Sequence, residues 1–90
     1  MQTLIIKAKE QTDKLGITYL IYKDGRKEVA RITYPINGIL NGYRASVNTS
    51  RSGGVSWGIH PDIETPKATA EEYITNVYSI TNKQILFQYL

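Results

Sequence analysis

The chain has 90 residues, a formal net charge of +3, 41% hydrophobic residues and no cysteine. This length allows one domain, 1–90, with a single hydrophobic core, and the composition is that of a globular rather than a disordered chain. The lack of cysteine excludes disulfides, thiolate nucleophiles and sulfur-ligated metal sites, and it is typical of a cytoplasmic protein. No apolar run reaches the roughly 20 residues of a transmembrane helix, and the first residues lack a signal-peptide pattern, so we expect no membrane partner.

The positive charge is concentrated in the first two thirds of the chain. Residues 1–60 hold nine Lys or Arg against four acids, a net charge of +5, whereas residues 61–90 hold two Lys against four acids, a net charge of −2. The basic part coincides with the predicted strands described below. We therefore expect a mildly basic sheet that suits an anionic partner, although ordinary solubilising lysines give the same totals.

Residues 3–9 predict a first strand, rich in β-branched residues. Lys7 and Lys9 share one of its faces, which is consistent with an edge strand, because lysine discourages aggregation between exposed sheet edges.

Residues 17–34 predict a β-hairpin, because Asp24-Gly25 between two strand-forming runs is a strong signal for a two-residue turn. In that register Tyr19 pairs with Ala30. The nearly apolar face that results comprises Ile17, Tyr19, Ile21, Ala30, Ile32 and Tyr34. The mixed opposite face includes Leu20, Tyr22, Lys27, Val29 and Arg31. We interpret it either as a surface for flat or anionic ligands or as a surface covered by the first strand or by a second protomer.

Residues 34–42 predict a turn-rich connection, with Pro35 and two Asn-Gly pairs. Its apolar residues, Ile36, Ile39 and Leu40, either plug the end of the core or form an exposed contact surface.

Residues 43–60 predict a second hairpin, which carries the only Trp and the only His. Residues that face each other across a hairpin share a sheet face, so the turn can be chosen by parity. A three-residue loop, Ser52-Gly53-Gly54, pairs Val47 with Ile59 and separates apolar from polar side chains. The apolar face then comprises Tyr43, Ala45, Val47, Val55, Trp57 and Ile59. The polar face comprises Arg44, Ser46, Asn48, Ser50, Ser56, Gly58 and His60.

Residues 68–80 predict a helix, since Thr69-Ala70-Glu71-Glu72 fits a capping box; a start at Thr65-Pro66 is the alternative. The apolar residues that would form its buried stripe are Ala70, Tyr73, Ile74, Val77 and Ile80 or Thr81. Residues 81–90 are either a final strand after a turn at Asn82-Lys83 or a second helix capped by Thr81. Their apolar composition indicates that they dock onto the core or onto another chain, including a second copy in a homodimer.

Together these elements predict an α+β fold. Its antiparallel sheet has four or five strands, including the hairpins 17–34 and 43–60, and the C-terminal helix packs on the apolar face. The expected core comprises Ile17, Tyr19, Ile32, Val47, Trp57, Ile59, Ile74 and Val77.

Signals for catalysis are scarce. His60 is the only imidazole, with Asp62 near it in sequence, and no serine lies in a nucleophile motif. One histidine with scattered carboxylates lacks the ligand spacing of a metal site. Arg51 followed by Ser52-Gly53-Gly54 has the composition of an anion-binding turn, but an ordinary hairpin turn has it too. We expect no enzymatic activity, no metal and no cofactor.

The sequence therefore predicts a binding protein whose basic and polar sheet face engages an anionic partner, a nucleic acid or a nucleotide. The residues predicted to bind it are Arg44, Ser46, Asn48, Arg51, Ser56, His60, Tyr22, Lys27 and Arg31. The alternative is a protein–protein inhibitor of a host nucleic-acid or defence enzyme, of phage or mobile-element type. Seven tyrosines favour it, because Tyr and Arg are common anchors of protein interfaces.

Overall fold

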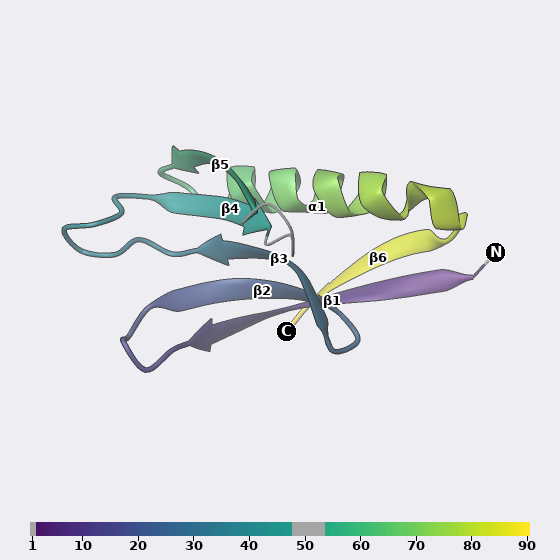
Figure 1. Ribbon diagram of the computed structural model, residues 1–90, viewed down its shortest axis with the longest axis horizontal. Helices are drawn as coiled ribbons and strands as arrows, with labels where there is room; N and C mark the ends of the chain where they lie inside the picture. Colours follow the sequence, from purple (N-terminus) through teal and green to yellow (C-terminus); the bar gives the residue numbers. More distant parts are fainter. Residues whose placement is uncertain (1, 48–53) are drawn as a thin grey trace.

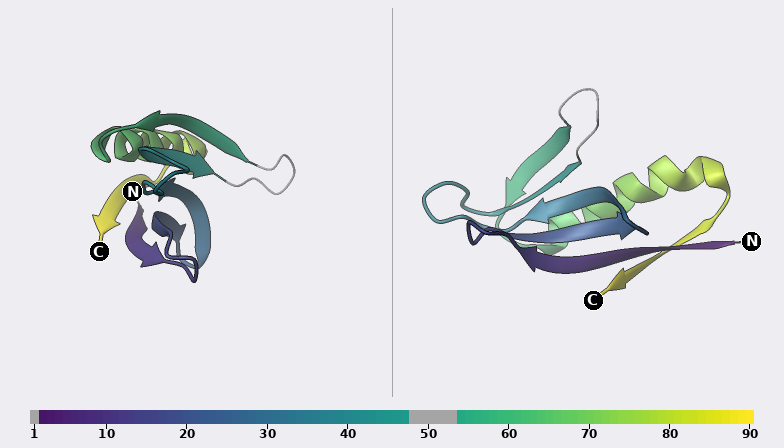
Figure 2. Two further views of the ribbon diagram at one scale, coloured as in Figure 1. Left: turned by 90° about the vertical axis from the view of Figure 1, so that its left-hand side faces the viewer. Right: turned by 60° about the horizontal axis from the view of Figure 1, so that its bottom comes forward.

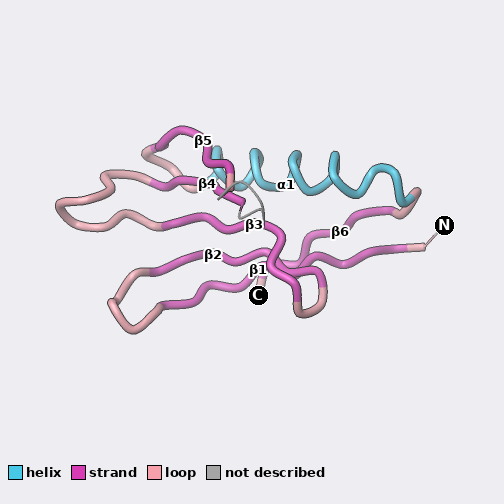
Figure 3. Tube along the Cα trace, viewed as in Figure 1, coloured by secondary structure: helices cyan, strands magenta, loops and turns pink. Residues whose placement is uncertain are grey.

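The computed structural model describes residues 2–47 and 54–90 and has the α+β architecture predicted (Figures 1 and 3). Its strands are β1 (Thr3–Thr12), β2 (Thr18–Asp24), β3 (Lys27–Thr33), β4 (Tyr43–Val47), β5 (Val55–His60) and β6 (Gln84–Tyr89). The helix α1 (Glu64–Tyr78) and a short 3-10 helix, η1 (Ser79–Thr81), lie between β5 and β6 in sequence. One six-stranded sheet has the order β5-β4-β3-β2-β1-β6, against the four or five strands predicted. Neighbouring strands are antiparallel except β6, which is parallel to β1.

α1 packs on one face of this sheet, mainly against β3 and β4 (Figure 2). We call the sheet face that meets α1 the helix face and the opposite one the open face. The core between sheet and helix comprises Ile6, Ala8, Leu20, Tyr22, Ala30, Ile32, Ala45, Val47, Ala70 and Ile74. Strand residues in this list alternate along β1, β2, β3 and β4, as expected for a sheet with one buried face.

β1 is an inner strand of the sheet, which corrects the interpretation of residues 3–9 as an edge. β2 pairs with its second half, from Lys7 to Thr12, and β6 pairs with its first half, from Thr3 to Ala8. The C-terminal segment supplies the outer strand, and this long-range pairing leaves no local signal in the sequence of β1.

The β2–β3 hairpin exists, but its predicted register is wrong. Asp24 pairs with Lys27, and beyond a bulge Tyr22 pairs with Ala30. The predicted two-residue turn at Asp24-Gly25 had instead paired Tyr19 with Ala30. A bulge adds one unpaired residue to one strand and so shifts the pairing beyond it. Consequently Leu20 and Tyr22 enter the core, and the residues that alternate with them, including Tyr19, lie on the open face.

The β4–β5 hairpin also has a different register from the one predicted. Val47 pairs with Val55, and beyond an irregularity that adds a residue to β5, Arg44 pairs with Ile59. The predicted pairing of Val47 with Ile59 is therefore wrong, while the Ser52-Gly53 part of the predicted turn lies outside the described residues. The extra residue rotates the end of β5, so that Ile59 shares a face with Arg44 and is 47% exposed instead of belonging to the core.

The connection between β3 and β4 combines the two roles considered for it. Ile36 and Leu40 form an isolated β-bridge, and Leu40 is buried at the end of the core, whereas Ile39 is 82% exposed. One apolar residue thus plugs the core and another remains at the surface.

α1 begins earlier than the predicted range of 68–80. The Asp62 carboxylate accepts a hydrogen bond of 3.0 Å from the backbone amide of Thr65, so an Asp supplies the capping interaction expected from Thr69. The buried helix residues are Pro66, Ala70 and Ile74, spaced four apart. The predicted stripe is confirmed at Ala70 and Ile74.

The predicted stripe is wrong at its C-terminal end. Val77 is 48% exposed and Ile80 is 91% exposed, because α1 ends at Tyr78 and the chain turns away from the sheet through η1. Asn82 ends η1 in the left-handed conformation, with φ 59°, and the chain then enters β6. Of the two alternatives for residues 81–90, the strand is the one observed.

Candidate functional site

Three lysines gather on the open face, near the middle of the sheet. Lys7 lies directly opposite Lys23 across β1 and β2, and Lys9 follows on the same face of β1. Ile6 and Ala8, which alternate with Lys7 and Lys9, are fully buried on the helix face, so strand alternation directs the lysines to the open face. We call Lys7, Lys9 and Lys23 the lysine cluster.

No lysine of the cluster forms an ion pair within residues 2–47 and 54–90. Glu28 lies opposite Lys23 across β2 and β3, but its carboxylate is bound to Arg31, and the second ion pair, Lys67–Glu64, lies in α1. Like charges placed directly opposite in a sheet destabilise it. The acids are instead concentrated in α1, which holds three glutamates and one lysine. The sheet therefore separates charge, with a basic open face and an acidic helix on the other side.

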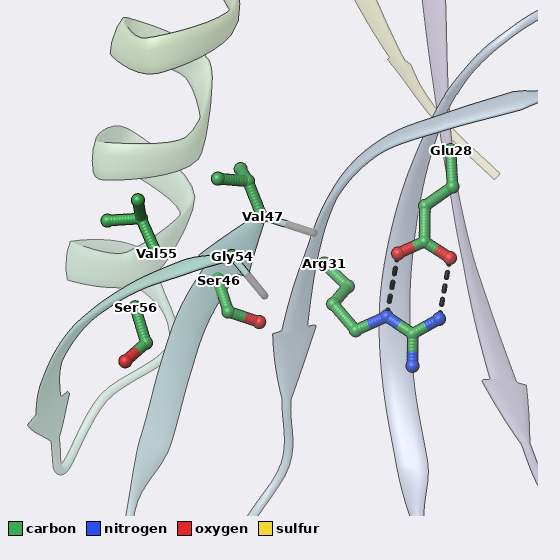
Figure 4. A pocket seen from close by; sticks show the side chains of 7 residues that line it. All are labelled: Glu28, Arg31, Ser46, Val47, Gly54, Val55 and Ser56. Carbon is green, nitrogen blue, oxygen red and sulfur yellow. Dashed lines mark hydrogen bonds and ion pairs between the residues drawn. The ribbon is translucent and has the colours of Figure 1, made fainter. Parts of the chain in front are cut away.

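A shallow hollow of about 190 Å³ lies next to this basic region on the open face (Figure 4). Its lining residues are Glu28, Arg31, Ser46, Val47, Gly54, Val55 and Ser56. Arg31 donates from Nε and Nη2 to the two carboxylate oxygens of Glu28 at 2.7 and 2.6 Å, and this contact raises the pKa of Arg31. The same guanidinium lies over the ring of Tyr19, 4.7 Å from its centroid. Arg31 is therefore already paired, and the hollow offers hydroxyl groups more than free positive charge.

Arg44 is the second arginine of the open face. It pairs across β4 and β5 with Ile59 and across β3 and β4 with Thr33. Its Nε is buried and has no hydrogen-bond partner among the described residues. A buried donor without a partner costs free energy, and this Nε is shielded from solvent rather than presented at the open face.

The structure brings together only part of the predicted binding set. Ser46 and Ser56 pair across β4 and β5 and line the hollow with Arg31. Lys27 is exposed at the start of β3. Asn48 and Arg51 lie outside the described residues.

His60 lies on the other side of the sheet from the predicted polar face. The extra residue in β5 pairs it with Tyr43, which alternates with Arg44 and so points to the helix face. The predicted grouping of His60 with Arg44, Ser46 and Ser56 is therefore wrong.

Tyr22 lies in the core and not on the exposed binding face predicted for it. It is fully buried, and Ala8 lies between it and Tyr89 in register. Because alanine is small, the two tyrosine rings meet over it with their hydroxyls 2.6 Å apart, and the Tyr89 hydroxyl donates to Glu71 at 2.5 Å. Burial raises the pKa of Tyr22 to about 12. This hydrogen-bonded chain links β2, β6 and α1.

The lysine cluster was not among the predicted binding residues. Its signal was visible in part, since Lys7 and Lys9 alternate with apolar residues along β1. The position of Lys23 opposite Lys7 depends on the β1–β2 turn, where Asp13 accepts backbone hydrogen bonds from Leu15 and Ile17 at 2.9 and 3.0 Å. Such an Asx-type turn sets the register between β1 and β2, and the sequence of the turn alone did not predict that register.

Within the part of the chain that the structure describes, no group of three His, Cys, Asp or Glu side chains could hold a metal ion. No described helix is both long enough and apolar enough to cross a membrane. Comparison of the chain with protein-family models, curated proteins and solved structures gave no match.

Proposed function

We propose that this chain is a non-enzymatic binding protein whose open face engages an anionic partner, with nucleic acid as the first candidate. The supporting observation is the lysine cluster, in which Lys7 and Lys23 lie directly opposite each other, while Glu28, the cross-strand neighbour of Lys23 on β3, is already bound to Arg31. Such an arrangement costs stability in the free protein, and an anion placed between the two ammonium groups removes that cost.

The spacing of the cluster suits a chain of phosphates better than a single small anion. Lys7 and Lys9 are separated by two residues of extended strand, about 6.7 Å, and Lys23 lies on the neighbouring strand about 4.8 Å away. Lysine ammonium groups on flexible stems reach successive phosphates without demanding one fixed geometry. Arg44 and the hydroxyls of Ser46 and Ser56 extend the polar surface towards β5.

Binding is tested by fluorescence anisotropy with labelled single-stranded and duplex oligonucleotides. If three lysines each neutralise one phosphate, the logarithm of the association constant should fall with the logarithm of salt concentration with a slope of about −2 for a single strand and about −2.7 for a duplex. A protein that binds through apolar anchors should show a much smaller slope.

A matched pair of variants locates the site. Lys7→Gln/Lys9→Gln should flatten the single-strand slope by about 1.4, whereas Lys14→Gln/Lys83→Gln removes the same charge outside the cluster and should change it little. Equal losses in the two variants would show that only net charge matters and would contradict the assignment of the site. Capture of a protein from a nuclease-treated lysate, with no oligonucleotide binding, would instead favour the inhibitor alternative.

A further inference from the structure

β6 is an outer strand of the sheet (Figure 2), and no described strand pairs with its free side. The amides of Gln84 and Leu90 donate to the carbonyls of Gln2 and Ala8, both at 2.9 Å, on the β1 side. Backbone groups alternate in direction along a strand, so those of Ile85, Phe87 and Tyr89 point to the free side. β6 therefore presents three residues in the pattern that another strand can bind.

The free edge of β6 lacks the features that normally protect an edge strand. Its sequence, Gln84-Ile85-Leu86-Phe87-Gln88-Tyr89, contains no charge, no proline and no bulge. β5, at the opposite edge, has an irregular register and is followed by Pro61. Only one of the two sheet edges is thus protected against pairing.

The sequence of β6 is complementary to itself in one antiparallel register. A twofold axis perpendicular to the sheet keeps each side chain on its own face, so only residues of equal parity can oppose each other. With Leu86 on the axis, Leu86 meets Leu86, Ile85 meets Phe87 and Gln84 meets Gln88 of the second copy. These pairs join like with like, and Tyr89 meets Lys83, just before β6, of the second copy. Moving the axis to Phe87 sets Leu86 against Gln88 and Gln84 against Leu90.

The same register satisfies the backbone. Ile85 and Phe87, whose amides and carbonyls face the free side, become a hydrogen-bonded pair, and Leu86 becomes a close non-hydrogen-bonded pair. On the open face Leu86 neighbours Ile5 of β1, and both side chains are about half exposed, at 47% and 49%. Two copies would join these into one apolar cluster of four side chains.

We propose that two copies of this chain pair through β6 in this register and form one continuous twelve-stranded sheet. This inference is independent of the proposed function, because it rests on the backbone and side chains of β6 alone. The pairing leaves both open faces on the same side, with Lys7 and Lys9 of each copy on β1, one strand inside the junction, and Lys23 on β2, the next strand.

Sedimentation equilibrium of the unmodified chain is the first test. Stable interfaces bury at least about 1,200 Å² in total, and a pair of six-residue strands buries about this area or less. Because such a dimer is weak, the protein concentrations measured should span about 5 to about 500 µM. A reversible monomer–dimer equilibrium is expected. Leu86→Lys places like charges face to face on the axis and should weaken dimerisation at least about tenfold. The control Val55→Lys introduces the same charge at a half-exposed position on the other edge strand and should leave dimerisation unchanged.

Cysteine cross-linking tests the register and does not depend on how Leu86→Lys folds. The natural chain has no cysteine, so a single introduced thiol can react only with its copy. Leu86→Cys should form a covalent dimer under mild oxidation, because opposed residues of a non-hydrogen-bonded pair bring their Cβ atoms to about 4.5 Å. Gln84→Cys should not form a covalent dimer, because Gln84 opposes Gln88 of the second copy. The two introduced thiols are then separated by four residues along the strands, about 13 Å, which is beyond disulfide reach. A monomer at all concentrations, or cross-linking that is equal in both variants, would overturn the proposal.

Discussion

The buried tyrosine of β2 makes stability depend on pH in the alkaline range. Tyr22 is fully buried, and its hydroxyl is hydrogen-bonded to that of Tyr89. Desolvation is the main cause that raises its pKa from 10 to about 12. The unfolded chain therefore releases this proton near pH 10, while the folded chain keeps it until about pH 12. The stability associated with Tyr22 is fully present below pH 10 and is lost as pH rises towards 12.

The size of this effect follows from the shift. Two pKa units correspond to about 2.7 kcal/mol when the loss is complete, and about 1.4 kcal/mol is already lost at pH 11. Tyr22→Phe keeps the ring and removes the ionisable hydroxyl. At pH 8 it should cost about 1 kcal/mol, the value of the hydrogen bond to Tyr89. At pH 11 the variant should be the more stable of the two by about 0.4 kcal/mol, because only the natural protein then carries the ionisation penalty of about 1.4 kcal/mol.

Urea unfolding of both proteins between pH 8 and pH 11, followed by circular dichroism, measures the two free energies side by side. Other alkaline effects, such as deprotonation of lysines, act on both proteins and cancel in the difference. The expected result is two stability curves whose difference changes by about 1.4 kcal/mol over this range, so that they cross before pH 11. Parallel curves would refute the reasoning, since they would show that the Tyr22 hydroxyl ionises no later in the folded chain than in the unfolded one.

Three further substitution tests concern packing, each read from urea midpoints. Ile74→Ala empties a fully buried site under α1 and should cost about 2–5 kcal/mol, whereas Ile80→Ala, at a 91% exposed position, should stay within about 0.5 kcal/mol. Gly42→Ala places a Cβ 2.6 Å from a backbone carbonyl oxygen of β5 and should cost about 1–3 kcal/mol, while Gly58→Ala meets nothing within 4 Å and should change little. Trp57→Ala should cost about 2 kcal/mol, below the 3–5 kcal/mol of a fully buried aromatic residue, because Trp57 is only partly buried against α1. A larger loss at the exposed member of either pair would contradict the packing described.

Local sequence signals located the elements better than their registers. Asp24-Gly25 correctly predicted a hairpin, and Gly25 has the positive φ of 62° expected of such a turn. The turn lies one residue later than predicted, and a bulge follows. Val29, near that bulge, resembles any other strand residue, so composition does not mark the extra position. One unrecognised residue was enough to move Tyr22 from a predicted binding face into the core.

The same limit applies to the candidate site. Ser46 and Ser56 were predicted correctly to share a sheet face, but the predicted register set Ser46 opposite His60, whereas the structure sets it opposite Ser56. His60 follows the irregularity of β5 and was placed on the wrong face. The lysine cluster depends on a pairing between β1 and β2, and the position of β1 depends in turn on β6. Contacts between residues this far apart in sequence leave no local pattern to read.

The face that α1 covers also decides where an anion can bind. Two ammonium groups about 5 Å apart repel by about 0.8 kcal/mol in water, and by about 3 kcal/mol at the effective dielectric constant of about 20 near a covered surface. Packing a helix over Lys7 and Lys23 would therefore cost several times more than leaving them in water. The helix has an acidic composition and lies on the opposite face, where Ile6 and Ala8 offer it an apolar surface. The alternation of lysine with apolar residues in β1 thus fixes both the buried side of the sheet and the side left open to a charged partner.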